Sequence, residues 1–438
     1  MLSCSYLLFA FFVYASFVSR AQSLVQGQED LPPPINLDVS LSEEKVSAGS
    51  SQKFLKKIAL RDVERGRRSV MRFKEGGQTA PSDSALFTGR AGGSSLNIEN
   101  DVVTYLAKVT IGSNNQTFKL IVDTGSSNTW IGADQKFGLS NTTELTGSKF
   151  SVGYGSGAAQ GAQIIETVNF GTKISLRQSI GVATQTQGFS DEEDGILGLG
   201  PTSLTRGTLS TPSTEIPTVM ETLFKENKIP SQVLGISFAP SSANKSLNGR
   251  MTLGGVDSTL FKGPLTWVPR TLTRPAAFYW GVNTTMFCGR LVVSQNSAGI
   301  MDTGTTLILL SDAALKNYID AIPGAILDSD PLTGTDLVMI AADQVATIPP
   351  FTIDFGNFKA TLSAEQQLFP ETISRQFGGK AGQRYSVISS LGPIQGLGGL
   401  DFIIGQKFLE HFYTAYDGTN NAVGLAPSTA SGFSQGAL

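Results

Sequence analysis

Two similar stretches of sequence decide the fold: Leu120-Ile-Val-Asp-Thr-Gly-Ser-Ser127 and Gly299-Ile-Met-Asp-Thr-Gly-Thr-Thr306. Each is followed further along the chain by two apolar residues and a glycine, Ile196-Leu197-Gly198 in the first case and Ile403-Ile404-Gly405 in the second. One Asp-Thr-Gly triplet is unremarkable, whereas two copies with matching flanks and matching downstream strands indicate an internal duplication. The sequence therefore predicts two related lobes, each with an apolar strand that ends in Asp-Thr-Gly.

The rest of the main body is typical of an all-β protein. From Asp101 onward, short β-type runs are separated by Gly or Asn, and in residues 104–111 apolar side chains alternate with mostly polar ones. Helical spacing occurs in residues 216–225, with Pro217 suited to the first turn, and in a second segment that Ser311 can cap. We therefore expect an all-β fold with few short helices.

Composition excludes several kinds of site. The chain has 438 residues, one histidine, two cysteines and a formal net charge of −3. So few His and Cys residues cannot build a zinc centre, and we expect no metal and no cofactor. Cys4 lies in a segment that we expect to be removed, which leaves Cys288 as a small buried apolar residue, while His411 is expected to be structural. Carboxylates remain as the carriers of acid–base chemistry.

The first residues are typical of a targeting segment. Residues 6–18 form an apolar run of thirteen, too short to span a bilayer, and small residues flank Arg20 before Gln22. We predict a signal peptide over residues 1–21 and a secreted, extracellular protein without stable membrane insertion. The alternative is an N-terminal anchor.

Charge is divided unevenly along the chain. Residues 22–90 hold 11 Lys+Arg and 9 Asp+Glu, whereas residues 91–438 hold 21 and 27. Within residues 53–74 there are nine basic side chains and two acidic ones. A basic run is often a solvated helix or a nucleic-acid contact. Because this one stands between a signal peptide and an acidic body, we predict a basic activation propeptide over residues 22–90 that lies on that body, and no nucleic-acid partner.

Asp123 and Asp302, the two aspartates of the duplicated stretches, are the candidate catalytic residues. Two carboxyls a few ångström apart share one proton, so one can act as a base on water while the other protonates a carbonyl oxygen. The alternative is that both aspartates only form Asx turns. Their neighbours can bend the backbone or offer a hydroxyl to the carboxyl: Thr124, Gly125, Ser126, Thr303, Gly304 and Thr305.

At these residues the chain resembles the pepsin family of aspartic endopeptidases, and within it looks most like the fungal polyporopepsin type. The likeness covers residues 91–438. The stretches that carry it are Val122-Asp-Thr-Gly-Ser-Ser-Asn-Thr-Trp130, Val152-Gly-Tyr-Gly-Ser-Gly157, Asp194-Gly-Ile-Leu-Gly-Leu-Gly200, Ala298-Gly-Ile-Met-Asp-Thr-Gly-Thr-Thr306, Phe402-Ile-Ile-Gly405, Phe412-Tyr-Thr-Ala-Tyr-Asp417 and Val423-Gly-Leu-Ala-Pro427.

The resemblance implies a bilobal pepsin-like fold, with an N-terminal lobe over residues 91–265 and a C-terminal lobe over residues 266–438. It implies a monomeric zymogen whose mature enzyme hydrolyses protein or peptide substrates at acidic pH, through a water activated between the two aspartates. Thr124 and Thr303 would lock the two active-site loops together.

The resemblance also implies a flap over the cleft. Tyr154 would lie on this flap, Gly155 and Ser156 would bind the substrate backbone, and Trp130 would hold the Tyr154 hydroxyl. Apart from the resemblance, Tyr154 and Trp130 would be interpreted as half-buried packing residues.

Several alternatives stay open at this point. The propeptide is cleaved either near Arg90-Ala91 or after Arg67-Arg68, and either Lys57 or Lys74 pairs with the two aspartates. Glu193 replaces a residue that is usually apolar in the family and lies near the S1 pocket. It is either an exposed loop charge or a determinant that favours a basic or polar substrate side chain.

Two further points concern modification and rival functions. Four Asn-x-Ser/Thr sequons are possible glycosylation sites: Asn115, Asn141, Asn244 and Asn283. One rival function is a catalytically silent pepsin-like binding protein, which the intact Asp-Thr-Gly turns and Tyr154 disfavour. Another is a carbohydrate hydrolase with two carboxylates, which gives no reason for the duplicated turns.

Overall fold

The computed structural model describes residues 35–40, 54–71, 96–100, 104–154, 157–171, 174–189, 193–211, 214–240, 246–330, 335–376, 379–392 and 398–430. Outside these residues lie the expected signal peptide, Lys74, the possible cleavage point at Arg90-Ala91, two flap residues and one sequon: Gly155, Ser156 and Asn244.

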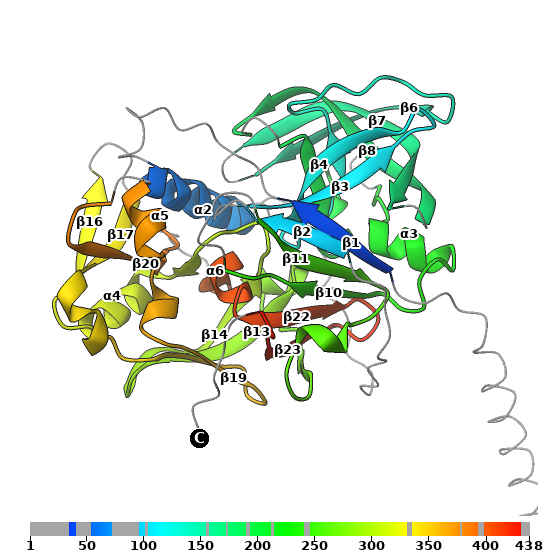
Figure 1. Cartoon of the computed structure of the whole chain (residues 1–438). Helices are drawn as coiled ribbons and strands as arrows, with labels where there is room; N and C mark the ends of the chain where they lie inside the picture. The colour runs from blue at the N-terminus through cyan, green and yellow to red at the C-terminus, as the bar shows by residue number, and fades with distance from the viewer. Residues whose placement is uncertain are drawn as a thin grey trace, which may run out of the picture.

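Two large sheets build the described part of the molecule (Figure 1). The first has fourteen strands in the order β12-β23-β22-β10-β11-β1-β2-β3-β4-β9-β5-β8-β7-β6. Its strands are β1 Ile35–Ser40, β2 Leu96–Asn100, β3 Tyr105–Ile111, β4 Gln116–Asp123, β5 Trp130–Ile131, β6 Glu144–Gly153, β7 Ala158–Phe170, β8 Ile174–Gln187, β9 Gly195–Gly198, β10 Val233–Ser237, β11 Ser246–Leu253, β12 Thr266–Pro269, β22 Phe412–Asp417 and β23 Ala422–Pro427.

The second sheet has nine strands in the order β16-β17-β20-β15-β21-β14-β13-β18-β19. They are β13 Gly281–Cys288, β14 Leu291–Met301, β15 Ile308–Leu310, β16 Ile326–Asp330, β17 Thr335–Ala341, β18 Phe351–Asp354, β19 Lys359–Leu362, β20 Gln383–Ser390 and β21 Phe402–Ile404. The described helices are α2 Phe54–Met71, α3 Val219–Lys225, α4 Asp312–Asp320, α5 Glu371–Gln376 and α6 Gln406–Leu409. The fold is all-β and bilobal, as predicted.

The strand pairing repeats in the two halves. β4 runs parallel to β9, with Asp123 opposite Gly198, and β14 runs parallel to β21, with Met301 opposite Ile404. A short strand then pairs antiparallel with the downstream strand in each half, β5 with β9 and β15 with β21. The matching strand pairings therefore confirm the duplication that was predicted from the sequence.

The apolar residues just before each aspartate explain its placement. Leu120, Ile121 and Val122 are all buried, as are Ile300 and Met301. A strand covered on both faces is continuously apolar rather than alternating. Each such strand ends at an aspartate, so both carboxyls are delivered into the interior between the lobes.

Two short helices differ in detail from the sequence-based expectation. The helix expected over residues 216–225 begins only at Val219, because Thr218 is its N-cap and forms a capping box with Glu221. Pro217 therefore precedes the helix. Ser311 does occupy the N-cap position of α4, but its side chain makes no capping hydrogen bond.

The helix α2 lies across the molecule between the strands β16, β17 and β20 and the strands β3 and β4 (Figure 1). Ile58 and Ala59 of this helix are buried in the main hydrophobic core. A side chain at Gly66 would collide with Leu391, so this glycine lets the helix approach the body closely. In the described part of the chain, no helix is long and apolar enough to cross a membrane.

Cys288 and His411 are both buried. Burial raises the pKa of the Cys288 thiol to about 11, which suits the predicted packing residue rather than a nucleophile. Burial lowers the pKa of His411 to about 4, and its Nδ1 lies 3.2 Å from Gln366 Nε2. Neither side chain lies among the residues of the duplicated turns.

Candidate active site

Asp123 and Asp302 are held by the same two hydrogen bonds in each half. The amide two residues on donates to the first carboxylate oxygen, at 2.9 Å from Gly125 N to Asp123 Oδ1 and at 2.9 Å from Gly304 N to Asp302 Oδ1. The hydroxyl three residues on donates to the second oxygen, from Ser126 at 2.5 Å and from Thr305 at 2.6 Å. Both aspartates are at most 1 % exposed.

A reciprocal pair of threonines joins the two active-site loops. Thr124 N donates to Thr303 Oγ1 at 2.9 Å, and Thr303 N donates to Thr124 Oγ1 at 3.0 Å. Each hydroxyl then donates across to a carbonyl of the other loop, Thr124 to Met301 O at 3.1 Å and Thr303 to Val122 O at 2.8 Å. Both side chains are fully buried, so the loops cannot separate without leaving buried polar groups unpaired.

The two glycines set the spacing of the carboxyls. A side chain at Gly125 would collide with the Asp302 carboxylate, and a Cβ added at Gly304 would lie 2.6 Å from Asp123 Oδ1. Each carboxyl therefore faces the backbone of the opposite turn at a distance that only glycine permits.

Tyr154 stands at the tip of the hairpin formed by β6 and β7, where Tyr154 N donates to Gly157 O at 2.7 Å. Trp130 Nε1 donates to the Tyr154 hydroxyl at 2.7 Å, as the resemblance led us to expect. Phe189 contacts both rings edge-on, with centroids 4.9 Å from Trp130 and 6.0 Å from Tyr154. The hydroxyl of Tyr154 is thus fixed by a buried donor.

Among the described residues, the cation at the aspartates is Arg65, whereas the sequence analysis predicted a lysine. Its Nη2 donates to Asp123 Oδ1 and to Asp302 Oδ1, the latter at 3.1 Å, and its Nε donates to Asp302 Oδ2 at 2.7 Å. A guanidinium offers several donors in one plane and bridges two carboxylates, which a single ammonium does less well. Of the two lysines considered, Lys74 lies outside the described residues and Lys57 is two turns earlier on α2.

Other contacts fix α2 over the aspartates. The Asp62 carboxylate accepts from Thr306 N at 2.9 Å and from Leu307 N at 2.8 Å, and Arg61 donates to the Thr306 hydroxyl at 2.7 Å. At the other end of the helix, Tyr279 donates its hydroxyl proton to Ser69 O at 3.1 Å.

Arg68 reaches the hairpin tip, since a Cβ added at Gly153 would lie 3.0 Å from Arg68 Nη1.

Sequence reasoning missed Arg65 and Asp62. The sequence did contain a pattern that indicates a basic helix face, because Arg61, Arg65 and Arg68 are spaced to lie on one side of a helix.

The electrostatics of the two carboxyls differ. Burial raises the pKa of Asp123, and the nearby Asp302 carboxylate adds to this effect. Burial would also raise the pKa of Asp302, but the Arg65 guanidinium and the Thr305 hydroxyl outweigh it and lower that pKa. Asp123 therefore takes up a proton more readily than Asp302 does.

Glu193 is not the exposed loop charge that was one interpretation of the sequence. It is 5 % exposed, and Thr104 Oγ1 lies at hydrogen-bond distance, 3.3 Å, from its Oε1. Its neighbour Asp194 accepts from Lys119 N at 2.7 Å and from Gln135 N at 2.9 Å, which ties this segment to β4. The described part of the loop is therefore folded inward, so a carboxyl group can be buried there.

The sequons that the structure describes are all exposed at the asparagine: Asn115, Asn141 and Asn283. Within the described ranges, no group of three or more His, Cys, Asp or Glu side chains is arranged to hold a metal ion.

Two interlocked Asp-Thr-Gly turns on matched strands, with a tyrosine-tipped hairpin, define a pepsin-like aspartic endopeptidase. Comparison with known sequences agrees, because the sequence model of the eukaryotic aspartyl protease family matches residues 104–428. The chain belongs to that family.

Particular relatives support the same assignment. The chain is 42% identical to polyporopepsin of Irpex lacteus over 332 residues, covering 75% of this chain and 96% of that protein. It is 29% identical to cathepsin E of Mus musculus over 348 residues, 74% of this chain and 80% of that protein. The crystal structure of the aspartic proteinase from Irpex lacteus superposes with a TM-score of 0.72 at 41% identity, covering 77% of this chain and 97% of that chain. The protein is an aspartic-type peptide hydrolase that acts on peptide substrates.

Proposed function

We propose that the chain is a secreted zymogen whose mature enzyme cleaves peptide bonds at acidic pH, with Asp123 and Asp302 as the catalytic dyad. The observation that carries the proposal is the matched pair of buried carboxylates, both bound by one arginine of α2. The signal peptide is residues 1–21, the propeptide residues 22–90, and the lobes residues 91–265 and 266–438.

In the mature enzyme the two carboxyls share one proton. The ionised member takes a proton from a water, and the other carboxyl protonates the scissile carbonyl oxygen as the water attacks. The turn amides and hydroxyls keep both carboxyls in position during this exchange. No covalent intermediate or cofactor is required, and the flap residues Tyr154, Gly155 and Ser156 hold the substrate backbone, with Trp130 fixing the tyrosine.

Inhibition of the zymogen follows from the position of α2. Arg65 occupies the place that a water and a substrate carbonyl would need between the two aspartates. Arg67 and Arg68 lie inside this helix, so a protease can cut after Arg67-Arg68 only once the helix unwinds. This supports processing near Arg90-Ala91.

The Arg65 contact weakens in acid. The contact lowers the pKa of Asp302, so it favours the docked helix at higher pH. The contribution is lost as the pH falls through the lowered pKa of Asp302. Acid therefore removes the charge that holds Arg65.

The test is cleavage of a denatured protein by the secreted enzyme at acidic pH, with and without pepstatin. We expect activity that pepstatin blocks and that Asp302→Asn abolishes, and N-terminal sequencing should place the mature end near Ala91. A folded Asp302→Asn protein with full activity would exclude the dyad mechanism. A folded, inactive wild type would favour the silent binding protein.

A further inference from the structure

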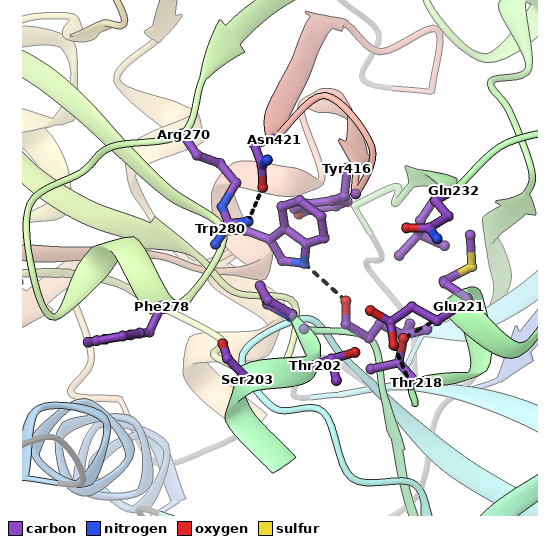
Figure 2. A pocket seen from close by; sticks show the side chains of 16 residues that line it. Thr202, Ser203, Thr218, Glu221, Gln232, Arg270, Phe278, Trp280, Tyr416 and Asn421 are labelled. Carbon is purple, nitrogen blue, oxygen red and sulfur yellow. Dashed lines mark hydrogen bonds between the residues drawn. The ribbon is translucent and has the colours of Figure 1, made fainter. Parts of the chain in front are cut away.

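A cavity lies away from the two aspartates, where residues of both lobes meet (Figure 2). Its volume is about 300 Å³, at the lower end of the range of small-molecule pockets. Residues 199–203 and α3 form one side, and Arg270, Trp280 and Asn421 form the other. No residue of the two Asp-Thr-Gly turns lines it.

Arg270 is the unusual feature of this cavity. Its guanidinium donates to three neutral oxygens, Tyr279 O at 3.0 Å, Ala277 O at 2.9 Å and Asn421 Oδ1 at 2.7 Å. Among the described residues, no carboxylate lies within ion-pair distance of it. Burial lowers the pKa of Arg270 to about 10, so its charge is poorly solvated as well as unpaired.

Apart from Arg270, the cavity has an apolar part and several polar side chains: Thr202, Ser203, Thr218, Glu221, Gln232 and Asn421. Leu199, Met220 and Trp280 are buried residues that line it, and the Arg270 guanidinium lies 5.2 Å from the centre of the Trp280 ring. The Thr202 hydroxyl is buried and has no hydrogen-bond partner among the described residues. Glu221 lies across the cavity from Arg270, held at the N-terminus of α3 (Figure 2).

We propose that this cavity binds a small aromatic carboxylate that carries a hydroxyl at its far end. The carboxylate pairs with Arg270, the ring packs against Trp280 and Met220, and the hydroxyl reaches Thr202. A carboxylate is favoured because it supplies the missing counter-charge to a partly buried guanidinium through paired hydrogen bonds. A hydroxyl at the other end suits Glu221, which would repel a second anionic group.

Calorimetric titration of the full-length chain near pH 6 tests the proposal, with 4-hydroxybenzoate as the probe. The probe is ionised at that pH. We expect saturable binding at one site, and binding of the uncharged 4-hydroxybenzamide at least about tenfold weaker, because it lacks the charge-assisted pair. This comparison uses the unaltered protein and does not depend on any variant folding.

Three variants locate the site. Arg270→Gln should weaken 4-hydroxybenzoate at least about tenfold, Arg270→Lys should retain part of the affinity, and Thr202→Phe should abolish binding by filling the cavity. Ser258→Phe, at an exposed position away from the cavity, is the matched control and should bind normally. Equal binding of the acid and the amide, unchanged binding in folded Thr202→Phe, or no measurable binding to the wild type would each overturn the proposal.

Discussion

Replacing Arg65 by glutamine should open the zymogen without any cleavage. Arg65 is 12 % exposed and pairs with two carboxylates that are at most 1 % exposed. Removing one partner of a buried ion pair costs about 3–5 kcal/mol. Once the guanidinium has been removed, the two aspartates can take up a proton, which reduces the uncompensated buried charge. We therefore use the lower end of this range, about 3 kcal/mol. That loss makes undocking of α2 roughly a hundredfold more favourable.

The assay is pepstatin affinity of the uncleaved chain near pH 6, with intact mass measured before and after. Pepstatin binds only where α2 has left the cleft, so its apparent Kd is the intrinsic value divided by the open fraction. Arg65→Gln should therefore lower the apparent Kd by about a hundredfold, or down to the value of the mature enzyme.

Arg67→Gln is the matched control, because Arg67 is exposed on the same helix and carries the same charge. It should leave the apparent Kd within a few fold of the wild type. If Arg65→Gln and Arg67→Gln bound pepstatin equally and as weakly as the wild type, the buried ion pairs would not hold the helix in place.

Four further predictions follow from the site. Trp130→Phe removes the donor to the Tyr154 hydroxyl and should lower kcat/KM of the mature enzyme about tenfold in steady-state assays. Thr303→Val leaves the buried amide of Thr124 unpaired and should cost about 2–4 kcal/mol in urea unfolding, with no loss if the loops are independent. Glu193→Val should reduce cleavage of Lys-containing relative to Leu-containing peptides, and an unchanged ratio removes the specificity hypothesis. Asn141→Gln should increase gel mobility of the secreted protein if that exposed sequon carries a glycan.

The sequence predicted the dyad well because the signal there is local. An apolar strand, a tight turn and a short downstream strand were each visible as a contiguous stretch. Their repetition then implied the pairing found between β4 and β9 and between β14 and β21. The contact between Trp130 and Tyr154 came from resemblance alone, since two aromatic residues far apart in sequence carry no local sign of it.

The features that sequence reasoning missed depend on how separate segments dock. Nine basic residues lie in residues 53–74, and the one that reaches the aspartates is set by the rotation of α2 on the body. Glu193 is surrounded by charged residues in the sequence, yet Thr104 lies at hydrogen-bond distance from its carboxyl. The cavity lined by Arg270 forms between residues that lie about 80 apart in sequence. Two of them, Leu199 and Trp280, are joined by a 3.0 Å hydrogen bond from the indole to the Leu199 carbonyl.

Asp62 opposes the acid release that Arg65 favours. Burial of its carboxyl raises the pKa from 3.8 to about 6, so the docked helix holds this proton more tightly than the free helix does. Docking therefore gains stability as the pH falls from above 6 towards 3.8, by roughly 3 kcal/mol at about 1.4 kcal/mol per pH unit. This gain has the opposite sign to the contribution of Asp302.

In the proposed zymogen, Asp62 and Asp302 affect docking of α2 in different pH ranges. Between pH 6 and 3.8 the protonation of Asp62 strengthens docking, while the Arg65 contact is retained until Asp302 takes up its own proton. Because Arg65 outweighs burial and lowers the pKa of Asp302 from its ordinary value of 3.8, that step comes only below this range. Protonation of Asp62 therefore opposes opening in mild acid, and Asp302 is the carboxyl whose protonation favours release of α2.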